Sequence, residues 1–309
     1  MPNLRRYLLP WALILFFLLV LSLLYRSPLP ATTSTPPQPA LQSGFRKEIV
    51  VASRYDDDTS WLEKELPDWG RSIYIVNDNS AKLTVPINKG REAMVYLTYI
   101  INHYDNLPDI MAFPSDADGV PLLQSLQIPY IVSEGYINLR CVWTLGCPNE
   151  LQFGRENDGE RVTELKYPQA FQELFPGTPV PPIVGVACCA QFAATREQIR
   201  TKTLEDWKHY RKWLTDTELD DATSGRVLEY AWHIILGKPA VHCPNAAECY
   251  CKTYGLCNLV GCTRDACGDR WPFPPWANIP ENWPQKGWNG EDQSENYLAE
   301  LRNTSMAPV

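Results

Sequence analysis

The sequence predicts an α/β domain whose sheet is parallel or mixed and is flanked by helices. Residues 47–55, 71–78 and 110–113 are apolar runs that end in polar residues, as buried strands do, and residues 90–104 carry apolar side chains at helical spacing. Strand, helix and strand in this order are typical of a sheet with parallel strands. About 265 residues follow the N-terminal region, enough for one sizeable domain.

The chain begins with a candidate membrane anchor. Residues 7–25 are 19 residues without a charge, close to the roughly 20 that span a bilayer as a helix. Arginines in the short tail 1–6 favour a cytosolic N-terminus, with the body in the ER or Golgi lumen or outside the cell. A cleaved signal peptide is the alternative, although no small-x-small cleavage site follows. The Pro-, Ser- and Thr-rich segment 26–46 predicts an extended stalk.

The main domain is expected over residues 47–268, followed by a Trp- and Pro-rich tail over 269–309. The tail carries one glycosylation sequon, which makes Asn303 a candidate glycan acceptor. Within the domain, four side chains share one helical stripe: Trp207, Tyr210, Trp213 and Leu214. A packed core face is the first interpretation of this stripe, and an aromatic platform for an acceptor is the alternative.

Charge and motifs exclude several classes of function. The formal net charge is −8, the pI is near 5.1 and no basic patch is present, so we expect no nucleic-acid partner. The sequence has no nucleophile elbow, no P-loop and no dinucleotide-binding glycine pattern. Serine hydrolases, P-loop nucleotidases and dinucleotide oxidoreductases are therefore disfavoured.

The ten cysteines predict structural disulfides. Six of them lie in one stretch of the C-terminal region: Cys243, Cys249, Cys251, Cys257, Cys262 and Cys267. A zinc site that includes His242 is the alternative, but no paired C-x-x-C is present and a lumenal body favours disulfides. Cys141 and Cys147 are expected to close another small loop, and the adjacent Cys188 and Cys189 cannot both point the same way in a strand. Connectivity stays open at this level.

Polar residues follow the predicted strands and mark a candidate substrate site. In open α/β sheets, ligands bind outside the carboxyl ends of the strands. Asp56, Asp57, Asn77 and Asp78 lie at such ends, and Arg91 begins a predicted helix whose N-terminus could orient phosphates. For the acidic residues, a solvated loop is the alternative interpretation.

Asp116 and Asp118 form the candidate metal site. They follow the predicted strand 110–113, and two nearby carboxylates suit a Mn²⁺ or Mg²⁺ ion that bridges a diphosphate. A polar turn is the alternative, because aspartate is common in turns and bonds to its own backbone there.

Glu229 and His233 are the candidate catalytic pair. Their i, i+4 spacing predicts one shared face of a helix. In that arrangement Glu229 would be the base that deprotonates an acceptor hydroxyl. The alternative is a half-buried pair that only stabilises the helix.

Several segments carry a family resemblance. They are "IVVASRYDDDTSWLEKELPDW", "NKGREAMVYLTYIINHYDNLPD", "GYINLRCVWTLGCP", "GVACCAQFAATREQIR", "GRVLEYAWHIILGKPAVHCP" and "ECYCKTYGLC". Together they resemble a fungal family catalogued as a domain of unknown function, family 3431, over nearly all of residues 47–257. The resemblance implies a shared fold rather than an activity.

One segment departs from that family's pattern. The family places a stretch rich in His and Trp between the third strand and the "DG" before "VPLL", whereas here "AFPSDADGVPLL" has no histidine. Either this protein lost the loop or its gene model skipped an exon. With the loop absent, Asp116 and Asp118 are expected to bind a divalent ion only weakly.

The anchor, stalk and α/β body resemble, more distantly, the GT-A glycosyltransferases of the secretory pathway. This resemblance implies a metal-dependent transferase with a nucleotide-sugar donor and a small-molecule or glycan acceptor. Two other hypotheses stay open: a membrane-bound tailoring enzyme of fungal secondary metabolism, and a non-catalytic lumenal module. Fold-level analogy alone does not decide between them.

Overall fold

The structure is a computed structural model that describes residues 44–114, 123–154, 161–259 and 261–267, together with Asp292 and Ser294. By its internal contacts the chain divides into Met1–Gly44 and Phe45–Val309, and nearly all described residues belong to the second unit. No helix in the described ranges is long and apolar enough to cross a bilayer, and the predicted anchor 7–25 lies outside them.

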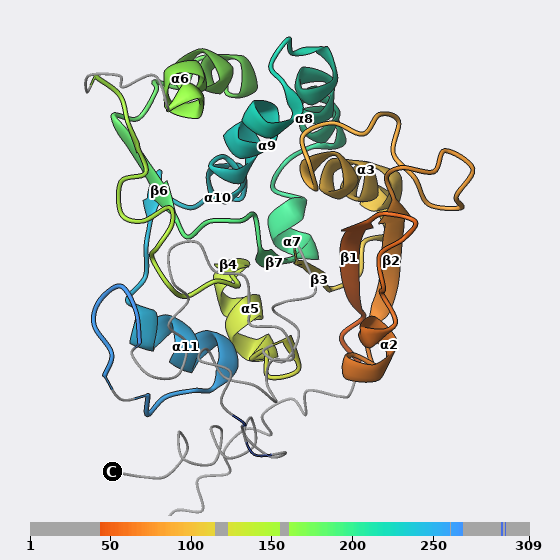
Figure 1. Cartoon of the computed structure of the whole chain (residues 1–309), viewed down its shortest axis with the longest axis vertical. Coiled ribbons are helices and arrows are strands. Elements are labelled where there is room, and N and C mark those ends of the chain that lie inside the picture. The colour runs from red at the N-terminus through yellow and green to blue at the C-terminus, as the bar shows by residue number, and fades with distance from the viewer. Residues whose placement is uncertain are drawn as a thin grey trace, which may run out of the picture. The chain divides into compact units, whose positions relative to one another are not determined.

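Strands and helices are interspersed along the described chain (Figure 1). The strands are β1 (Lys47–Ser53), β2 (Gly70–Ile75), β3 (Ile110–Phe113), β4 (Tyr136–Asn138), β5 (Leu151–Gln152), β6 (Ile183–Val186), β7 (Phe192–Thr195) and β8 (Val241–His242). The helices are α2 (Trp61–Glu65), α3 (Ala93–His103), η1 (Tyr104–Asn106), α5 (Ile128–Glu134), α6 (Val162–Leu174), α7 (Arg196–Ile199), α8 (Leu204–Asp216), α9 (Asp221–Glu229), α10 (Trp232–Ile235) and α11 (Ala246–Tyr254). Helices α7 to α10 follow one another between β7 and β8.

The main sheet is mixed. Its strand order is β2-β1-β3-β7-β4, in which β1 is parallel to both β2 and β3, while β7 runs antiparallel between β3 and β4. The predicted α/β class and the parallel pairing of the first three strands are confirmed. A smaller sheet has the order β5-β6-β8, and nothing in the sequence analysis anticipated it.

Alternating side chains give the main sheet two buried faces, as the two-residue period of a strand requires. In β1, Val50 joins one hydrophobic cluster and Ile49 and Val51 join the other. In β3, Phe113 belongs to the first cluster and Ala112 to the second. Both faces of these strands must therefore be covered by helices.

Two helical layers cover the sheet, as Figure 1 shows. Helices α3, α8, α9 and α10 pack into the first cluster, and α2, α5 and α11 pack into the second. The stripe Trp207, Tyr210, Trp213 and Leu214 on α8 is buried in the first cluster, so the core interpretation of this stripe is confirmed.

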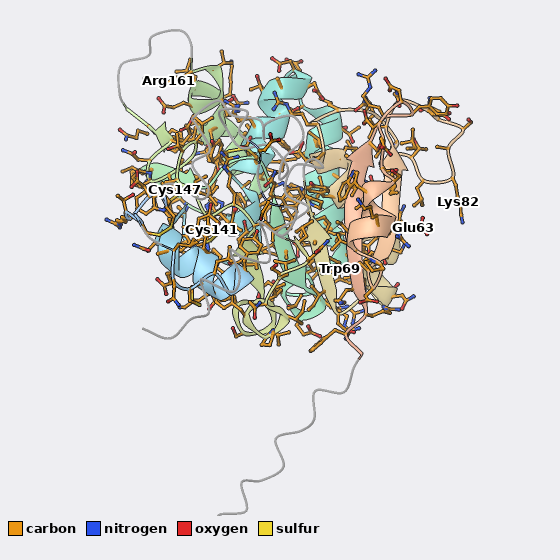
Figure 2. The ribbon with its side chains drawn as sticks, turned by 60° about the horizontal axis from the view of Figure 1, so that its bottom comes forward. Glu63, Trp69, Lys82, Cys141, Cys147 and Arg161 are labelled. Carbon is orange, nitrogen blue, oxygen red and sulfur yellow. A yellow bond between two sulfur atoms is a disulfide. The ribbon has the colours of Figure 1, made fainter. Side chains whose placement is uncertain are left out.

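Disulfides fasten the segment after β4 to the region around α11. Cys141 pairs with Cys249 and Cys147 with Cys243, so the expected small loop between Cys141 and Cys147 is wrong. Figure 2 labels Cys141 and Cys147, which lie near the blue helix α11. Two further disulfides close short loops: Cys251–Cys257 and Cys262–Cys267. Structural disulfides are thus confirmed, and the cysteines of the predicted zinc alternative are all paired.

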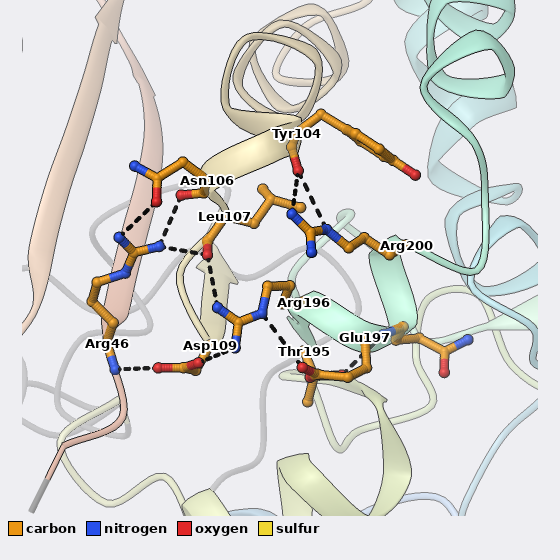
Figure 3. A network of polar contacts seen from close by, with 10 residues as sticks. Arg46, Tyr104, Asn106, Leu107, Asp109, Thr195, Arg196, Glu197 and Arg200 are labelled. Carbon is orange, nitrogen blue, oxygen red and sulfur yellow. Dashed lines mark hydrogen bonds and ion pairs between the residues drawn. The ribbon is translucent and has the colours of Figure 1, made fainter.

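A cluster of ionic and hydrogen-bonding side chains lies at the amino ends of β1 and β3 (Figure 3). This amino-end cluster consists of Arg46, Asn106, Asp109 and Arg196. The backbone N–H of Arg46 donates to Asp109 Oδ2 at 2.7 Å, and the Arg46 guanidinium donates to Asn106 Oδ1 at 3.0 Å. The guanidinium of Arg196 forms an ion pair with Asp109. The cluster joins the amino ends of two strands to the helix that follows β7.

Candidate functional site

The carboxyl-end edge of the main sheet brings together segments that are distant in sequence. Because β1, β2, β3 and β4 are parallel to one another and β7 is antiparallel, four strands end and one begins at this edge. Phe192, the first residue of β7, pairs with both Phe113 and Asn138. At the other end of the edge, Asn77 Oδ1 accepts a hydrogen bond from the Tyr55 N–H at 2.8 Å, so the loops after β1 and β2 meet as expected.

The predicted acidic residues of these two loops are held in local turns. Asp57 Oδ2 accepts from the Arg54 N–H at 2.6 Å, and Asp56 lies 3.3 Å from the Arg54 guanidinium. Asp78 accepts from both the hydroxyl and the N–H of Ser80, two hydrogen bonds that lower the pKa of its carboxyl. These contacts are those of a solvated acidic loop. A role in substrate binding stays a prediction for Asp56, Asp57 and Asp78.

Arg91 lies in a turn that packs directly on α9. Gly90 and Arg91 have φ values of 73° and 54°, in the left-handed region, and the Arg91 N–H donates to Asp221 Oδ1 at 3.2 Å. A Cβ atom at Gly225 would lie 3.1 Å from the Gly90 backbone, so glycine there permits the close approach. The turn before α3 therefore meets the helix that carries Glu229.

Glu229 ends α9 as a nearly buried carboxylate. Its Oε1 accepts a hydrogen bond from the Cys189 N–H at 2.6 Å, its Oε2 lies 3.9 Å from the Arg226 guanidinium, and its side chain is 9% exposed. Burial raises the pKa of the Glu229 carboxyl, while the Cys189 hydrogen bond and the charges of Arg226 and Arg91 oppose that rise. The charge of Glu150 acts with burial. A carboxyl with a raised pKa at this edge is suited to proton transfer.

His233 does not share a helical face with Glu229, so that prediction is wrong. The carbonyl of Tyr230 accepts a hydrogen bond from the Tyr167 hydroxyl at 2.8 Å, and α9 ends before α10 begins. His233 is fully buried, with Nε2 3.0 Å from the Ala240 carbonyl. Burial lowers its pKa to about 4. His233 is therefore a hydrogen-bonded residue of the core.

The adjacent cysteines form a disulfide in the turn before β7. Cys188 and Cys189 lie between strands, so the alternation rule applied to them in the sequence analysis does not hold. The turn is attached to the end of β4, where Asn138 Nδ2 donates to the Ala187 carbonyl at 2.9 Å. The Arg140 guanidinium lies 3.7 Å from Cys189 Sγ. The carboxyl-end site is hereafter Glu229 with Arg91, Asn138, Arg140, Cys188, Cys189 and Arg226.

Potential metal ligands in the described ranges gather at this same place. Sulfur atoms of Cys188 and Cys189 and a carboxylate oxygen of Glu229 lie within 4.8 Å of one another. The two sulfurs are bonded to each other and are therefore not thiolates. The predicted metal ligands Asp116 and Asp118, and the predicted glycan acceptor Asn303, lie outside the described residues.

Sequence reasoning missed Asn138, Arg140 and the partnership of Glu229 with Cys189. The Cys-Cys dipeptide was the one available signal, because two adjacent cysteines in a protein with other disulfides can bond to each other. A separate hollow of ≈ 770 Å³ between α6 and α8, lined by Lys166, Glu173, Lys212 and Trp213 among others, contains none of the catalytic, metal-binding or substrate-binding residues predicted for the sheet edge.

The comparisons with known proteins identify a family. A search of curated proteins and a search of solved structures each found no match. The family model described as "Protein of unknown function (DUF3431)" matches residues 49–252, which include the described residues of the carboxyl-end site. This match covers more than half of the chain, and the protein belongs to the DUF3431 family.

Proposed function

We propose that this chain is a glycosyltransferase-like enzyme that moves a sugar from a nucleotide-sugar donor to a small-molecule or glycan acceptor. The observation that carries the proposal is Glu229, a nearly buried carboxylate with a raised pKa at the carboxyl-end edge of an α/β sheet. Ligands of such sheets bind at this edge, and a carboxyl whose pKa is raised toward neutrality accepts protons efficiently. The mixed sheet is also compatible with the GT-A-like architecture that the sequence suggested.

In the proposed step, Glu229 accepts the proton of an acceptor hydroxyl as that oxygen attacks the anomeric carbon of the donor sugar. A new carbon–oxygen bond forms, and the bond between the anomeric carbon and the diphosphate breaks. The electron pair of that bond leaves with the nucleoside diphosphate. The Cys189 N–H, donating to Glu229 Oε1 at 2.6 Å, keeps the carboxylate oriented for this transfer.

Cationic side chains near Glu229 support the choice of an anionic donor. Arg226 lies 3.9 Å from the Glu229 carboxylate, and the charge of Arg91 also acts on it. One guanidinium group can donate two parallel hydrogen bonds to the oxygens of a phosphate. These arginines are therefore the candidates for holding a diphosphate. Mn²⁺ or Mg²⁺ at Asp116 and Asp118 would add positive charge when bound, but both residues lie outside the described ranges.

The proposed location is a single-pass membrane protein with its body in the ER or Golgi lumen or outside the cell. The uncharged segment 7–25 is the basis for the anchor. The five disulfides support an oxidising compartment, because cytosolic thiols are kept reduced.

The test is a donor screen with the full chain. UDP-, GDP- and CMP-linked sugars are supplied with and without Mn²⁺, and release of the nucleotide is measured in the presence of a pool of glycan and small-molecule acceptors. We expect metal-dependent release with at least one donor. Glu229→Gln should lower that rate by about 100-fold or more, because a positioned base contributes on the order of 10²–10⁴.

Glu164→Gln is the matched control for this variant. Glu164 is also nearly buried and also accepts from a backbone N–H, that of Gln152 at 2.8 Å. It lies on α6, where it contacts the smaller sheet and lines a hollow together with Arg226, so its replacement should lower nucleotide release far less than Glu229→Gln does. Absence of release with every donor would overturn the proposed activity. Equal rates in Glu229→Gln and Glu164→Gln would overturn the role of Glu229.

A further inference from the structure

The Cys188–Cys189 disulfide lies beside the hydrogen bond that orients Glu229. The two bonded residues form a turn in which Cys189 and Ala190 have φ values of 80° and 49°. This left-handed region is uncommon for residues other than glycine. From this turn the Cys189 N–H donates to Glu229 Oε1 at 2.6 Å. The donor to the proposed base thus depends on an unusual backbone conformation.

The residues on the N-terminal side of this turn are held in place by the rest of the edge. The Cys188 N–H donates to the Leu145 carbonyl at 3.0 Å, and the Ala187 carbonyl accepts from Asn138 Nδ2 at 2.9 Å. With Ala187 and Cys188 fixed, the direction of the Cys189 N–H is set by the peptide bond between the two cysteines. The disulfide closes a small ring across that same peptide bond and so restricts its rotation.

We infer that the Cys188–Cys189 disulfide is a positioning element for Glu229, which holds the Cys189 N–H against the carboxylate and releases it when the disulfide is reduced. The inference rests on the role proposed for Glu229 as the base. Reduction by a small dithiol transfers two electrons and two protons to the pair, giving two thiols, while the dithiol becomes a cyclic disulfide. Glu229 itself is unchanged in this reaction and loses only its donor.

Loss of that donor has a measurable consequence. A hydrogen bond to a carboxylate favours its ionised form, so removing the bond raises the pKa of the carboxyl. The other charged groups that act on Glu229 are Arg226 on its own helix, Arg91 before α3 and Glu150 before β5. None of these three is attached to the disulfide, and their effects should persist.

The experiment titrates Glu229 in the full chain by carbon-13 NMR of labelled glutamate carboxyls. The Glu229 signal is assigned as the one that disappears in Glu229→Gln. We compare the oxidised wild type with the double variant Cys188→Ser, Cys189→Ser. The control is Cys262→Ser, Cys267→Ser, which removes another disulfide of short sequence separation in the second hydrophobic cluster. The Glu229 midpoint should rise in the first variant and stay unchanged in the control.

A second measurement covers the case in which the Cys188/Cys189 variant does not fold. Wild-type protein is treated with graded dithiothreitol, and alkylation with mass spectrometry finds the concentration at which this pair alone has opened. An unchanged Glu229 midpoint in the folded variant or in the selectively reduced protein would overturn the inference. A pair that never opens before the domain unfolds would overturn it as well.

The titration needs no substrate, so the two proposals can fail separately. If the Glu229 midpoint shifts but Glu229→Gln releases nucleotide at the full rate, the positioning role of the disulfide stands and the role of Glu229 as the base is overturned. If Glu229→Gln loses activity as expected but the Glu229 midpoint does not shift in the Cys188/Cys189 variant, the role of Glu229 as the base stands and the positioning role of the disulfide is overturned.

Discussion

The two edges of the main sheet both carry acidic and arginine side chains, but the charges are arranged differently. In the amino-end cluster, each carboxylate oxygen of Asp109 has a donor: the Arg46 N–H at one and the Arg196 guanidinium at the other. At the carboxyl end, Glu229 receives one backbone N–H and a looser contact of 3.9 Å from Arg226. Burial raises the pKa of Glu229, whereas the Asp109 carboxylate is enclosed by two cationic residues.

This difference separates a structural ionic cluster from a candidate for chemistry. The Arg46 guanidinium also donates to the carbonyls of Asn106 and Leu107, at 2.8 and 2.5 Å, so its capacity is used for joining chain segments. The Asp109 carboxylate, with a donor at each oxygen, has little freedom to accept a proton from a substrate. Glu229 is buried enough for its pKa to be raised, and among the described residues its Oε2 has only the 3.9 Å contact with Arg226, which is the combination expected of a base.

The largest effect on stability is expected from the disulfides that hold the carboxyl-end edge. Cys141–Cys249 closes a sequence separation of 108 residues and fastens the segment that carries Arg140. Replacing both cysteines by serine should lower the free energy of unfolding by about 3 kcal/mol, because Cys147–Cys243 lies within this loop and leaves a ring of about 15 residues to be released in the unfolded chain. Urea denaturation measures this change.

The Cys251–Cys257 disulfide provides the matched control, since its sequence separation is only 6. Removing it in the same way should cost about 2 kcal/mol in the chain-entropy estimate. Equal losses in the two double variants would show that ring size does not set the contribution, and that the carboxyl-end edge is not specially dependent on Cys141–Cys249.

A buried histidine extends the comparison, because His233 is an ionisable group whose hydrogen-bond partner among the described residues is a neutral backbone carbonyl, that of Ala240. Burial depresses the pKa of His233 from 6.5 to about 4 in the folded state. As pH falls through that interval, the unfolded chain binds a proton that the folded chain does not, so stability is lost, by about 3 kcal/mol for one such group. His233→Gln should reduce the dependence of unfolding free energy on pH in this interval, and the part due to His242, whose pKa burial also lowers to about 4, should remain. His209→Gln, at an exposed histidine, is the control for replacing an imidazole by an amide.

The amino-end cluster should respond in stability alone. Asp109→Asn removes the charge that pairs with Arg196 and is expected to lower the free energy of unfolding by about 2 kcal/mol, as for hydrogen bonds to charged groups. Asp216→Asn is the control, because Asp216 pairs with Lys212 on the exposed surface and should change stability by less than about 0.5 kcal/mol. Nucleotide release should be unaffected in both. A loss of activity in Asp109→Asn that exceeds its loss of stability would break the distinction between the two edges.

Local patterns predicted the elements that depend on local periodicity. The apolar runs located β1, β2 and β3, and the helical spacing located α3 within a few residues. The meeting of Tyr55 and Asn77 followed from the parallel arrangement, because the carboxyl ends of parallel strands share one edge. The burial of the α8 stripe followed from its spacing in the same way.

Features set by long-range contacts could not be predicted in this way. The end of α9 beyond Glu229 is not marked by glycine or proline, and the Tyr230 carbonyl bonds instead to Tyr167, which is 63 residues away. The hydrogen bond between Glu229 and Cys189 spans 40 residues. Spacing along the chain therefore located Glu229 but placed the wrong residue beside it.

The pH dependence of transfer tests most directly the claim that Glu229 is the base at the carboxyl-end edge. Only the ionised carboxylate accepts a proton, so kcat/KM of the wild type should rise with pH through the pKa of Glu229. Because burial raises that pKa, the midpoint of the rise should lie above the ordinary value of 4.5. In Glu229→Gln the rate should be low and this rise should be absent. A rise with the same midpoint in Glu229→Gln would contradict the assignment.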